Sequence, residues 1–593
     1  MKRHVLLLVY VAAVIPALVM ALTQPVWSRI DEAPNADFIV QLSHGVYPVA
    51  DATPIAPETM AVLRDEGFFS PLHPSAYGEV DGPPPDPTDR DPIPPGLSDR
   101  ANAVWMSRHI WTLSRESDQT PIYYLAMAPV WWTADRIGGT YAAIYVIRVL
   151  GALIVATLAP MAVALARMIA PARPEIAALA AVFAVLLPGL DLNGPRISND
   201  GLAAALGGVF VLLAVRHAGT SWTWRRALLM GLVLGLGLMT KLTLAGLFPA
   251  LVVSASWPAP GTRWRSRLAW LAVSGAVAVA CLVPWLLLNL HLYGELTPGV
   301  HATRLQDGLP GSLTPTYVGA DLATFLVTWW SGEPWGTLPL ALAFVVLGVL
   351  LALTAPVALV NLWTGRSPGE VKGRLAVIAA AVVGMMLAAL SLPATTRFAF
   401  EGHGRFAYAA AAGAAVLWAL GLSAVLKSAP VRRAVAALYA VVVVVMLGAS
   451  AASYHAAPLP SPGPGAPPAG AAMTSVSASG RLQSVTISVD EVALDAAGRV
   501  TWFEVTVDNA SSVEVDWPGV PDVSMDGRPV TVDYLRSTHM PGDVDPGRTI
   551  TGWVRVAIDP AAVHPGDHAL LRFQDVAVDT YRTVEDVEVS VAL

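Results

Sequence analysis

Long apolar runs separated by short basic loops constrain this chain more than any other feature. Only 14% of the residues are charged while 54% are hydrophobic, and the mean hydropathy is +0.55. Such a composition predicts a polytopic α-helical membrane protein and excludes a soluble enzyme. The runs give about eleven spans, with approximate cores at 4–22, 139–166, 174–191, 201–216, 227–240, 242–256, 268–290, 338–362, 375–394, 406–426 and 433–453.

The flanking charges predict the orientation of these spans. Lys2 and Arg3 precede the first run, which places the N-terminus in the cytoplasm; a cleaved signal peptide is the alternative interpretation. Every second loop is basic, and an odd number of spans leaves the C-terminus outside. The segment 227–256 is too short for two full spans, but both its flanks are basic, so it is predicted to go out and return with Lys241 at its outer tip. The basic loops contain Arg167 and Arg173; Arg216, Arg225 and Arg226; Arg263, Arg265 and Arg267; Arg366, Lys372 and Arg374; and Lys427, Arg432 and Arg433.

Two regions fall outside the membrane. The first is a long outer loop, 23–140, whose Pro- and Asp-rich stretch 81–95 cannot form a core. Within this loop, 101–113 and 123–132 have the apolar spacing of short helices at the membrane surface. The sequence therefore predicts a membrane domain, 1–455, that carries one large irregular outer loop.

The second region follows a linker rich in Pro, Gly and Ala, 456–474. From 475 to 593 the pattern changes to short alternating runs, among them 484–489, 501–507 and 551–557. Turn signals at Asp526-Gly527 and Pro541-Gly542 separate such runs. This region predicts a β-sandwich domain on the outer side. Trp502, Trp517 and Trp553 within it are either core residues or a platform on which sugars stack.

Charge and cysteine usage narrow the partners. The net charge of -7 gives no reason to expect a nucleic-acid partner. The single cysteine, Cys281, lies in an apolar span, so no intramolecular disulfide forms and the outer domain must be stabilised by packing.

Polar residues gather where spans meet the predicted outer face. Ionisable groups near lipid are costly unless they are paired or functional, so we expect these side chains to line one cavity. Asp31 and Glu32 follow the first span, and Lys241 lies at the hairpin tip. The other members are Arg196, Asn199 and Asp200 before the fourth span, and Glu401, His403 and Arg405 before the tenth.

Each candidate also has a structural interpretation. Asp31 with Glu32, and Asn199 with Asp200, can cap helices. Lys241 can extend to the interface, Arg405 can anchor a helix there, and Arg148 inside a span can form a structural ion pair. His44 and His403 lack metal-ligand spacing, so no tightly held metal is expected, although a loosely bound divalent ion at Asp31 and Glu32 remains an alternative.

The outward Asp31-Glu32 pair and the segment Gln119 to Tyr124 resemble the GT-C superfamily of polyprenyl-phosphate-sugar-dependent glycosyltransferases, such as the protein O-mannosyltransferases. The chain is more similar to an uncharacterised family of bacterial membrane proteins that are themselves GT-C-like. The resemblance covers about 1–454 and rests on the order of several weak motifs: Ser198 to Gly201, Gly235 to Lys241, Pro284 with Trp285, Asn289, Tyr293 with Gly294, Trp329 to Gly332 with Trp335, and Gly404 to Phe406.

The resemblance implies a GT-C fold and an inverting glycosyltransferase that moves a sugar from a polyprenyl phosphate to an envelope glycan, lipid or protein. Asp31 and Glu32 would be catalytic, with Asp31 as general base. Arg405, Lys241 and Arg196 would bind the donor phosphate, with Arg405 foremost because its planar fork holds two oxygens. The substrate-binding candidates are Asn199, Asp200, His44, Glu401, His403, Arg148 and Tyr124.

Two departures from the family-like pattern affect substrate preference. Asn35 stands where a histidine usually follows the acidic pair, and His403 stands where a glutamine usually precedes Gly404. The alternative to an enzyme is a membrane transporter or an envelope scaffold with a binding β-domain. Charges near the middle of the bilayer would favour a transporter, whereas most charges here lie at the outer ends of spans.

Overall fold

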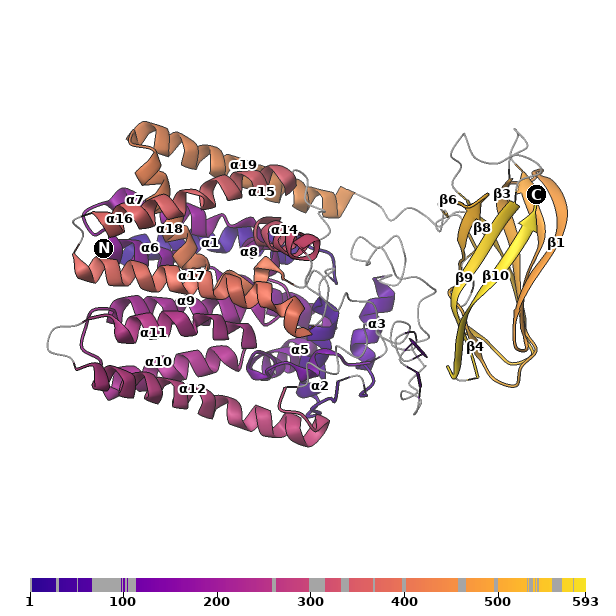
Figure 1. The fold of residues 1–593 in the computed structure, drawn as a ribbon, viewed down its shortest axis with the longest axis horizontal. Helices are drawn as coiled ribbons and strands as arrows, with labels where there is room; N and C mark the ends of the chain where they lie inside the picture. The colour runs from indigo at the N-terminus through magenta and orange to yellow at the C-terminus, as the bar shows by residue number, and fades with distance from the viewer. Residues whose placement is uncertain are drawn as a thin grey trace. The chain divides into compact units, whose positions relative to one another are not determined.

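The computed structural model divides the chain into two compact units, which are described separately (Figure 1). One unit comprises Met1–Ala50 and Arg115–Ala456, and the other comprises Asp51–Ser114 and Ala457–Leu593. The structure describes residues 3–27, 31–50, 52–66, 97–98, 100–101, 104, 113–258, 263–297, 315–331, 341–365, 368–396, 402–456, 465–494, 500–530, 532, 537–538, 540, 543–556, 568–579 and 581–593.

The first unit is helical. Its elements are α1 (Arg3–Thr23), α2 (Glu32–Ser43), η1 (Glu116–Asp118), α5 (Ile122–Val155), α6 (Leu158–Ile169), α7 (Pro174–Val185), α8 (Pro188–Asn193), α9 (Asp200–His217), α10 (Trp224–Leu238), η2 (Leu242–Leu247), α11 (Phe248–Ser256), α12 (Trp264–Tyr293), α14 (Pro315–Ser331), α15 (Ala341–Ala352), α16 (Thr354–Thr364), α17 (Gly369–Thr396), η3 (Gly404–Ala410), α18 (Ala411–Val425) and α19 (Ala429–Ala456).

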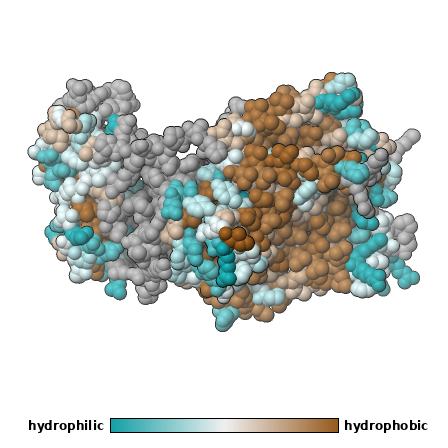
Figure 2. Space-filling model, turned by 180° about the vertical axis from the view of Figure 1, so that it is seen from behind, coloured by the Kyte–Doolittle hydropathy of each residue, from teal (hydrophilic) through white to brown (hydrophobic). Residues whose placement is uncertain are grey.

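The helical unit has the length and composition of a multi-pass membrane protein. Among the described residues, seven helical segments are long and apolar enough to cross a bilayer. Further apolar helices at Pro174–Val185, Leu242–Ser256 and Val345–Asn361 are shorter. Figure 2 shows a broad hydrophobic surface on this unit with hydrophilic residues at its margins, as lipid contact requires. The membrane class is therefore confirmed, whereas the expected eleven spans are not reproduced as long helices.

Two predicted breaks are present. Gly139 inside α5 has φ 79° and ψ 177°, which is not helical, so it separates the predicted surface helix from the span that follows. The hairpin within 227–256 also breaks as expected: α10 ends at Leu238, and Lys241 has extended dihedral angles before η2 begins. The basic flanks of that segment thus predicted its internal turn correctly.

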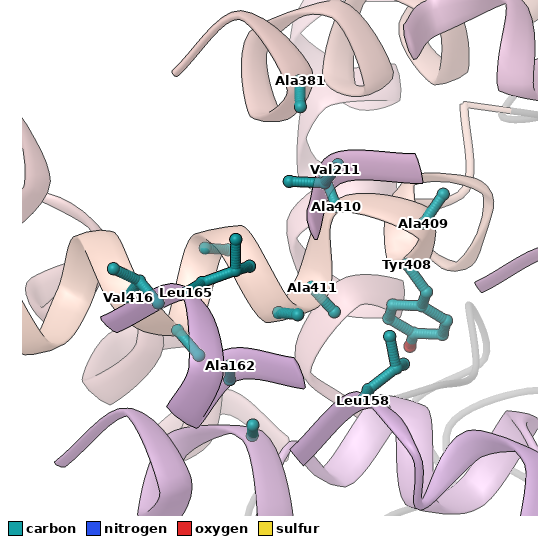
Figure 3. Packing of buried hydrophobic residues seen from close by; sticks show 14 of the residues in the cluster. Leu158, Ala162, Leu165, Val211, Ala381, Tyr408, Ala409, Ala410, Ala411 and Val416 are labelled. Carbon is teal, nitrogen blue, oxygen red and sulfur yellow. The ribbon is translucent and has the colours of Figure 1, made fainter. Parts of the chain in front are cut away.

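Small residues bring the helices together in the core. Ala162 of α6, Val211 of α9 and Ala411 of α18 are almost fully buried, and Figure 3 shows them among the side chains that lie between these helices. Alanine and glycine allow close approach of helix backbones where hydrophobic burial alone does not drive association. This packing places the start of α9 against η3, the element that carries Arg405.

Other elements differ from the sequence analysis. The predicted span 174–191 ends early, because the chain breaks before Pro188 and α8 starts there. The predicted span 338–362 is interrupted between α15 and α16. Helix α14 was not predicted at all, since Asp321 divides its apolar run.

The second unit contains α3 (Pro57–Asp65) and an isolated β-bridge between Pro54 and Leu113. Most of the predicted helix 101–113, the stretch 81–95 and the predicted turn at Pro541-Gly542 lie outside the described residues. Its strands are β1 (Ala472–Leu482), β2 (Val485–Leu494), β3 (Val500–Asn509), β4 (Val515–Asp516), β5 (Asp522–Met525), β6 (Arg528–Val530), β7 (Asp543–Val544), β8 (Thr549–Arg555), β9 (His568–Val578) and β10 (Thr583–Ala592).

These strands form the predicted sandwich. In the described part, one sheet has the order β1-β2-β3-β8, and the other has β6-β5-β9-β4-β7 with β10 beside β9. One apolar core joins them, with Phe503 from the first sheet and Phe573 from the second. Asp526 and Gly527 both have positive φ between β5 and β6, as the predicted tight turn requires.

The three tryptophans of this domain differ in how deeply they are buried. Trp517 is 1% exposed and belongs to the core. Trp502 is also buried and lies beneath the Arg555 guanidinium, 5.7 Å from its carbon. Trp553 is half-buried and pairs across the strands with Glu504. The core interpretation therefore holds for Trp517, and Trp553 is the most exposed of the three.

Candidate active site

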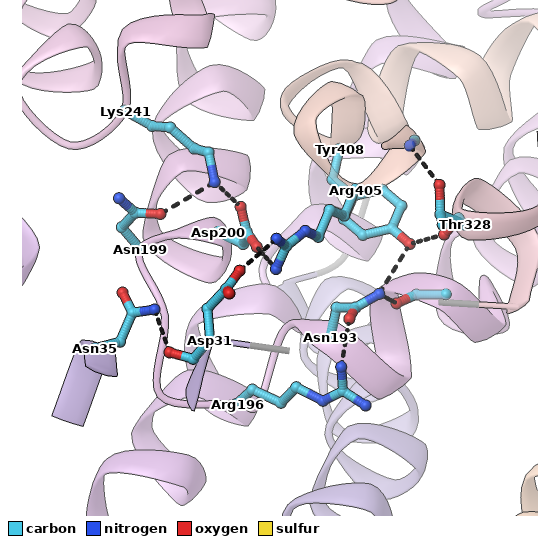
Figure 4. Close-up of polar contacts among 12 residues, drawn as sticks. Asp31, Asn35, Asn193, Arg196, Asn199, Asp200, Lys241, Thr328, Arg405 and Tyr408 are labelled. Atoms are coloured by element: carbon cyan, nitrogen blue, oxygen red, sulfur yellow. Dashed lines mark hydrogen bonds and ion pairs between the residues drawn. The ribbon is translucent and has the colours of Figure 1, made fainter. Parts of the chain in front are cut away.

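Asp31 lies directly before α2, and its carboxylate points at Arg405, which is 374 residues later in the chain. Its Oδ2 accepts a hydrogen bond from Arg405 Nη2 at 2.7 Å (Figure 4). Asp31 occupies the N-cap position, but its side chain makes no cap hydrogen bond, so the capping interpretation does not describe this carboxylate. Its φ of 50° is in the left-handed region, where a residue with a side chain is strained.

The environment of Asp31 favours the ionised form. Burial by itself raises the pKa of Asp31, but the charge and hydrogen bond of Arg405 outweigh it and hold the pKa below its ordinary value. The side chain remains 37% exposed, whereas that of Arg405 is 9% exposed. An accessible carboxylate is thus fixed against a buried cation.

A second ion pair adjoins the first. Lys241 Nζ lies 2.5 Å from Asp200 Oδ1 and donates to Asn199 Oδ1 at 3.2 Å. Asp200 Oδ2 is 3.6 Å from Arg405 Nη1, which joins the two pairs into one cluster (Figure 4). Lys241 also lies 4.3 Å from the centroid of the Phe406 ring. The cluster therefore gathers two cations and two carboxylates from the starts of α2, α9, η2 and η3.

His403 and Glu116 have unusual protonation near this cluster. Burial, with the nearby Arg405 charge, lowers the pKa of His403 to about 3, so the imidazole is neutral at physiological pH. Its ring stacks on Phe406 with centroids 5.6 Å apart. Burial and the charge of Asp31 raise the pKa of Glu116 well above its ordinary value. Of these two neighbouring carboxyl groups, Asp31 therefore favours the ionised form and Glu116 the protonated form.

Glu32 does not accompany Asp31 but enters a separate buried pair. Its carboxylate accepts hydrogen bonds from Arg148 Nε at 2.8 Å and from Arg148 Nη2 at 2.5 Å. Both side chains are at most 1% exposed. Arg148 also donates to the carbonyls of Gln24 and Pro25, and the Ile197 N–H donates to Glu32. This arrangement is the structural ion pair that was the alternative for Arg148.

Arg196 lies in the same segment as Asp200 but binds amide oxygens. It donates to Gln24 Oε1 and to Asn193 Oδ1, each at 2.9 Å. Asn193 in turn donates to the Gly189 carbonyl and lies 3.5 Å from the Tyr408 hydroxyl. The Arg196 guanidinium thus connects α8 to the end of α1.

Amide groups and a hydroxyl connect the segment 116–124 to the cluster. Their central residue is Gln119, which the sequence marked as part of a family-like segment but not as a site residue. Gln119 Oε1 accepts a hydrogen bond from Asn199 at 2.5 Å and lies 3.1 Å from the Tyr124 hydroxyl oxygen, while the Gln119 amide donates to Glu116. The Tyr124 hydroxyl donates to Asn35 Oδ1, and the Asn35 amide donates to the Asp31 carbonyl, each at 2.5 Å. Gln119 carries no charge, so in the sequence only the family-like segment that it begins could mark it.

Two candidates lie apart from this arrangement. His44 is exposed at the C-terminal end of α2, which puts it about 20 Å from Asp31 along the helix. Glu401 lies outside the described residues. Within the described ranges, no group of three or more His, Cys, Asp or Glu residues could hold a metal ion.

Comparisons with known proteins give structural likeness only. No family model matches the chain, and no curated protein matches it. The oligosaccharyltransferase of Archaeoglobus fulgidus in the apo form aligns with 76% of this chain at 16% identity and a TM-score of 0.41. The same enzyme tethered to an acceptor peptide gives 15% identity and a TM-score of 0.41, and the complex with an inhibitory peptide and a dolichol-phosphate gives 16% and 0.35. This chain spans 56% of the length of the apo enzyme.

Proposed function

We propose that this protein is an inverting glycosyltransferase of GT-C type. It would move a sugar from a polyprenyl-phosphate donor to an envelope glycan, lipid or protein on the outer face of the plasma membrane. The observation that carries the proposal is the accessible, ionised Asp31 carboxylate beside the buried Arg405 in a multi-pass helical unit. The family-like motifs in the sequence support the same activity.

Asp31 is the proposed general base. Its ionised carboxylate takes the proton from an acceptor hydroxyl as that oxygen forms a bond to the anomeric carbon of the sugar. The bond from that carbon to the phosphate oxygen breaks, and its electron pair leaves with the polyprenyl phosphate. Because attack and departure occur on opposite faces, the anomeric configuration inverts.

Arg405 and Lys241 are the proposed partners of the leaving phosphate. The phosphate gains negative charge as the bond breaks, so preorganised cations stabilise the transition state more than the ground state. Asp200 lies 2.5 Å from the Lys241 amine and 3.6 Å from the Arg405 guanidinium, which limits where both cations can lie. Arg196 is a third phosphate candidate through its place in the same segment.

The remaining candidates support these groups. Glu32 and Arg148 would position Asp31 through their buried pair, since Glu32 is its neighbour in the chain. Tyr124 would act through Asn35 on the Asp31 backbone. His403 adjoins Arg405, and its neutral ring suits a sugar hydroxyl better than a phosphate. We assign no metal to the reaction, and the β-domain after the linker is proposed to lie outside the membrane.

The test is mass spectrometry of envelope glycans and lipid-linked sugars from cells that lack the protein. The deletion is complemented with wild type, with Asp31→Asn, or with Asp65→Asn as the control, because Asp65 is an exposed carboxylate of the same outer loop. A sugar that is lost on deletion and restored by wild type and Asp65→Asn, but not by Asp31→Asn, is the expected result. Glycans that do not change on deletion would contradict the proposal and favour a transporter or scaffold.

A further inference from the structure

Arg405 is carried by a short turn whose backbone is held by side chains of α14. Asp321 Oδ1 accepts the N–H of Gly402 at 2.9 Å, and Thr328 Oγ1 accepts the N–H of Gly404 at 2.6 Å. Asp321 and Thr328 are about two helical turns apart, so they lie on one face of α14. One face of α14 therefore binds the backbone of the turn 402–405 at two points.

The turn also approaches α14 too closely for side chains larger than hydrogen. A Cβ at Gly404 would lie 2.4 Å from the Phe325 carbonyl oxygen, and one at Gly402 would lie 2.3 Å from Asp321 Oδ1. Beyond the turn, the Tyr408 hydroxyl donates to the Thr328 carbonyl at 3.0 Å (Figure 4). Three hydrogen bonds and a backbone contact thus fix the turn on both sides of Arg405.

Fixing this backbone matters because Arg405 has several partners at once. Its guanidinium lies 2.7 Å from Asp31 and 3.6 Å from Asp200, so a shift of the turn would change both distances. A bidentate fork holds phosphate oxygens only within a narrow range of positions. Asp321 is 5% exposed and Thr328 is fully buried, so water does not readily replace the bonds that they make.

We propose that Asp321 and Thr328 of α14 are positioning residues that set the affinity of Arg405 for a lipid-linked phosphate without touching it. This inference rests on the proposed function, since it takes Arg405 as the phosphate ligand. Helix α14 is then the support of the donor site, and its role is separate from that of the Asp31 base.

The experiment measures binding of undecaprenyl monophosphate, which carries no sugar, to the purified full-length protein in detergent. The variants are Asp321→Ala with Asp321→Asn, and Thr328→Val with Thr328→Ser. Asn and Ser keep an oxygen that accepts the backbone N–H, whereas Ala and Val do not. We expect about tenfold weaker binding for the Ala and Val variants and a change within about twofold for the Asn and Ser variants.

Arg405→Ala serves as the reference that separates the two claims. If it binds the lipid as wild type does, the assignment of Arg405 in the proposed function fails. If Arg405→Ala loses binding while Asp321→Ala and Thr328→Val do not, the positioning inference alone is overturned. Equal losses in both members of each pair also overturn it, because the conservative variants keep the hydrogen bond. If Asp321→Ala does not fold, by its elution and thermal unfolding, the Thr328 pair decides the question.

Discussion

Arg405 binds the Asp31 carboxylate at 2.7 Å although the two residues are 374 positions apart in the chain. In the proposed reaction, the cation that receives the leaving phosphate thus also holds the base before substrate binds. A phosphate that enters the cluster competes with Asp31 for the guanidinium. Donor binding would then weaken the ion pair and raise the basicity of Asp31 when the acceptor arrives.

Arg405→Gln should move the acidic limb of the pH–rate profile to higher pH. Asp31 has a lowered pKa because Arg405 outweighs the effect of burial, and without that charge burial is left to raise it. The measurement is kcat/KM for the acceptor against pH, with Lys372→Gln, at the start of α17, as control. A limb that stays in place while the rate falls would show that Arg405 does not set the protonation of Asp31.

Glu32→Gln should destabilise the protein by ~3–5 kcal/mol, because it leaves Arg148 buried without a charged partner. Arg148→Met should lower the free energy of unfolding by a similar amount. The double variant should lower it by less than the sum of the two single losses. Unfolding in detergent measures this, and Glu175→Gln is the control. Its exposed pair with Arg173 should contribute only ~0–1 kcal/mol. Additive losses would contradict a direct pair.

Lys241→Met should weaken binding of the lipid-linked donor by about tenfold and leave the KM of the acceptor unchanged. The variant removes one cation and leaves the buried Asp200 to compete for Arg405, which lies 3.6 Å from it. Steady-state kinetics with each substrate varied in turn provides the test. A change in the KM of the acceptor alone would show that Lys241 binds the acceptor and not the donor.

Trp517→Ala should unfold the β-domain, since removal of a buried aromatic side chain costs ~3–5 kcal/mol and Trp517 is 1% exposed in that core. Trp553→Ala should cost less because its side chain is half-buried. Limited proteolysis of the full chain reports the difference as the rate of cleavage within 465–593. Equal resistance of the two variants would be inconsistent with the core position of Trp517.

A cysteine at position 475 should react with a membrane-impermeant maleimide added to intact cells. Ser475 is exposed on β1, and the basic loops predict that this domain lies outside. The substitution is made together with Cys281→Ser, so that the single native thiol does not react. Labelling only after the cells are broken open would refute the predicted orientation.

Elements whose signals lie within their own residues could be predicted from the sequence. Charges on both sides of 227–256 predicted the turn at Lys241, and alternation predicted β2, β3 and β8, because these signals lie within the elements themselves. Helix α14 was not predicted because the charged Asp321 interrupts its apolar run. This same carboxylate accepts the hydrogen bond from the Gly402 N–H.

The partners within the site depended on contacts far apart in the chain. The sequence marked Asp31, Asp200, Lys241 and Arg405 as members of one cavity, and the structure brings all four together. It could not assign Arg148 to Glu32, since nothing local distinguishes that carboxylate from its neighbour Asp31. Their different partners are set by the tertiary fold.

The composition of the second unit has a consequence for biogenesis. This unit combines Asp51–Ser114, from the early part of the chain, with Ala457–Leu593 at its end. Arg100 donates hydrogen bonds to both Asp575 and Asp586, so the early segment contacts residues that are translated near the end of the chain. During synthesis, residues 51–114 are therefore made before the helical residues 115–456, and their partner strands are translated only after those residues. A nascent chain that stalls before β9 would lack the strand that carries Asp575, and the second unit would remain incomplete with apolar surface exposed.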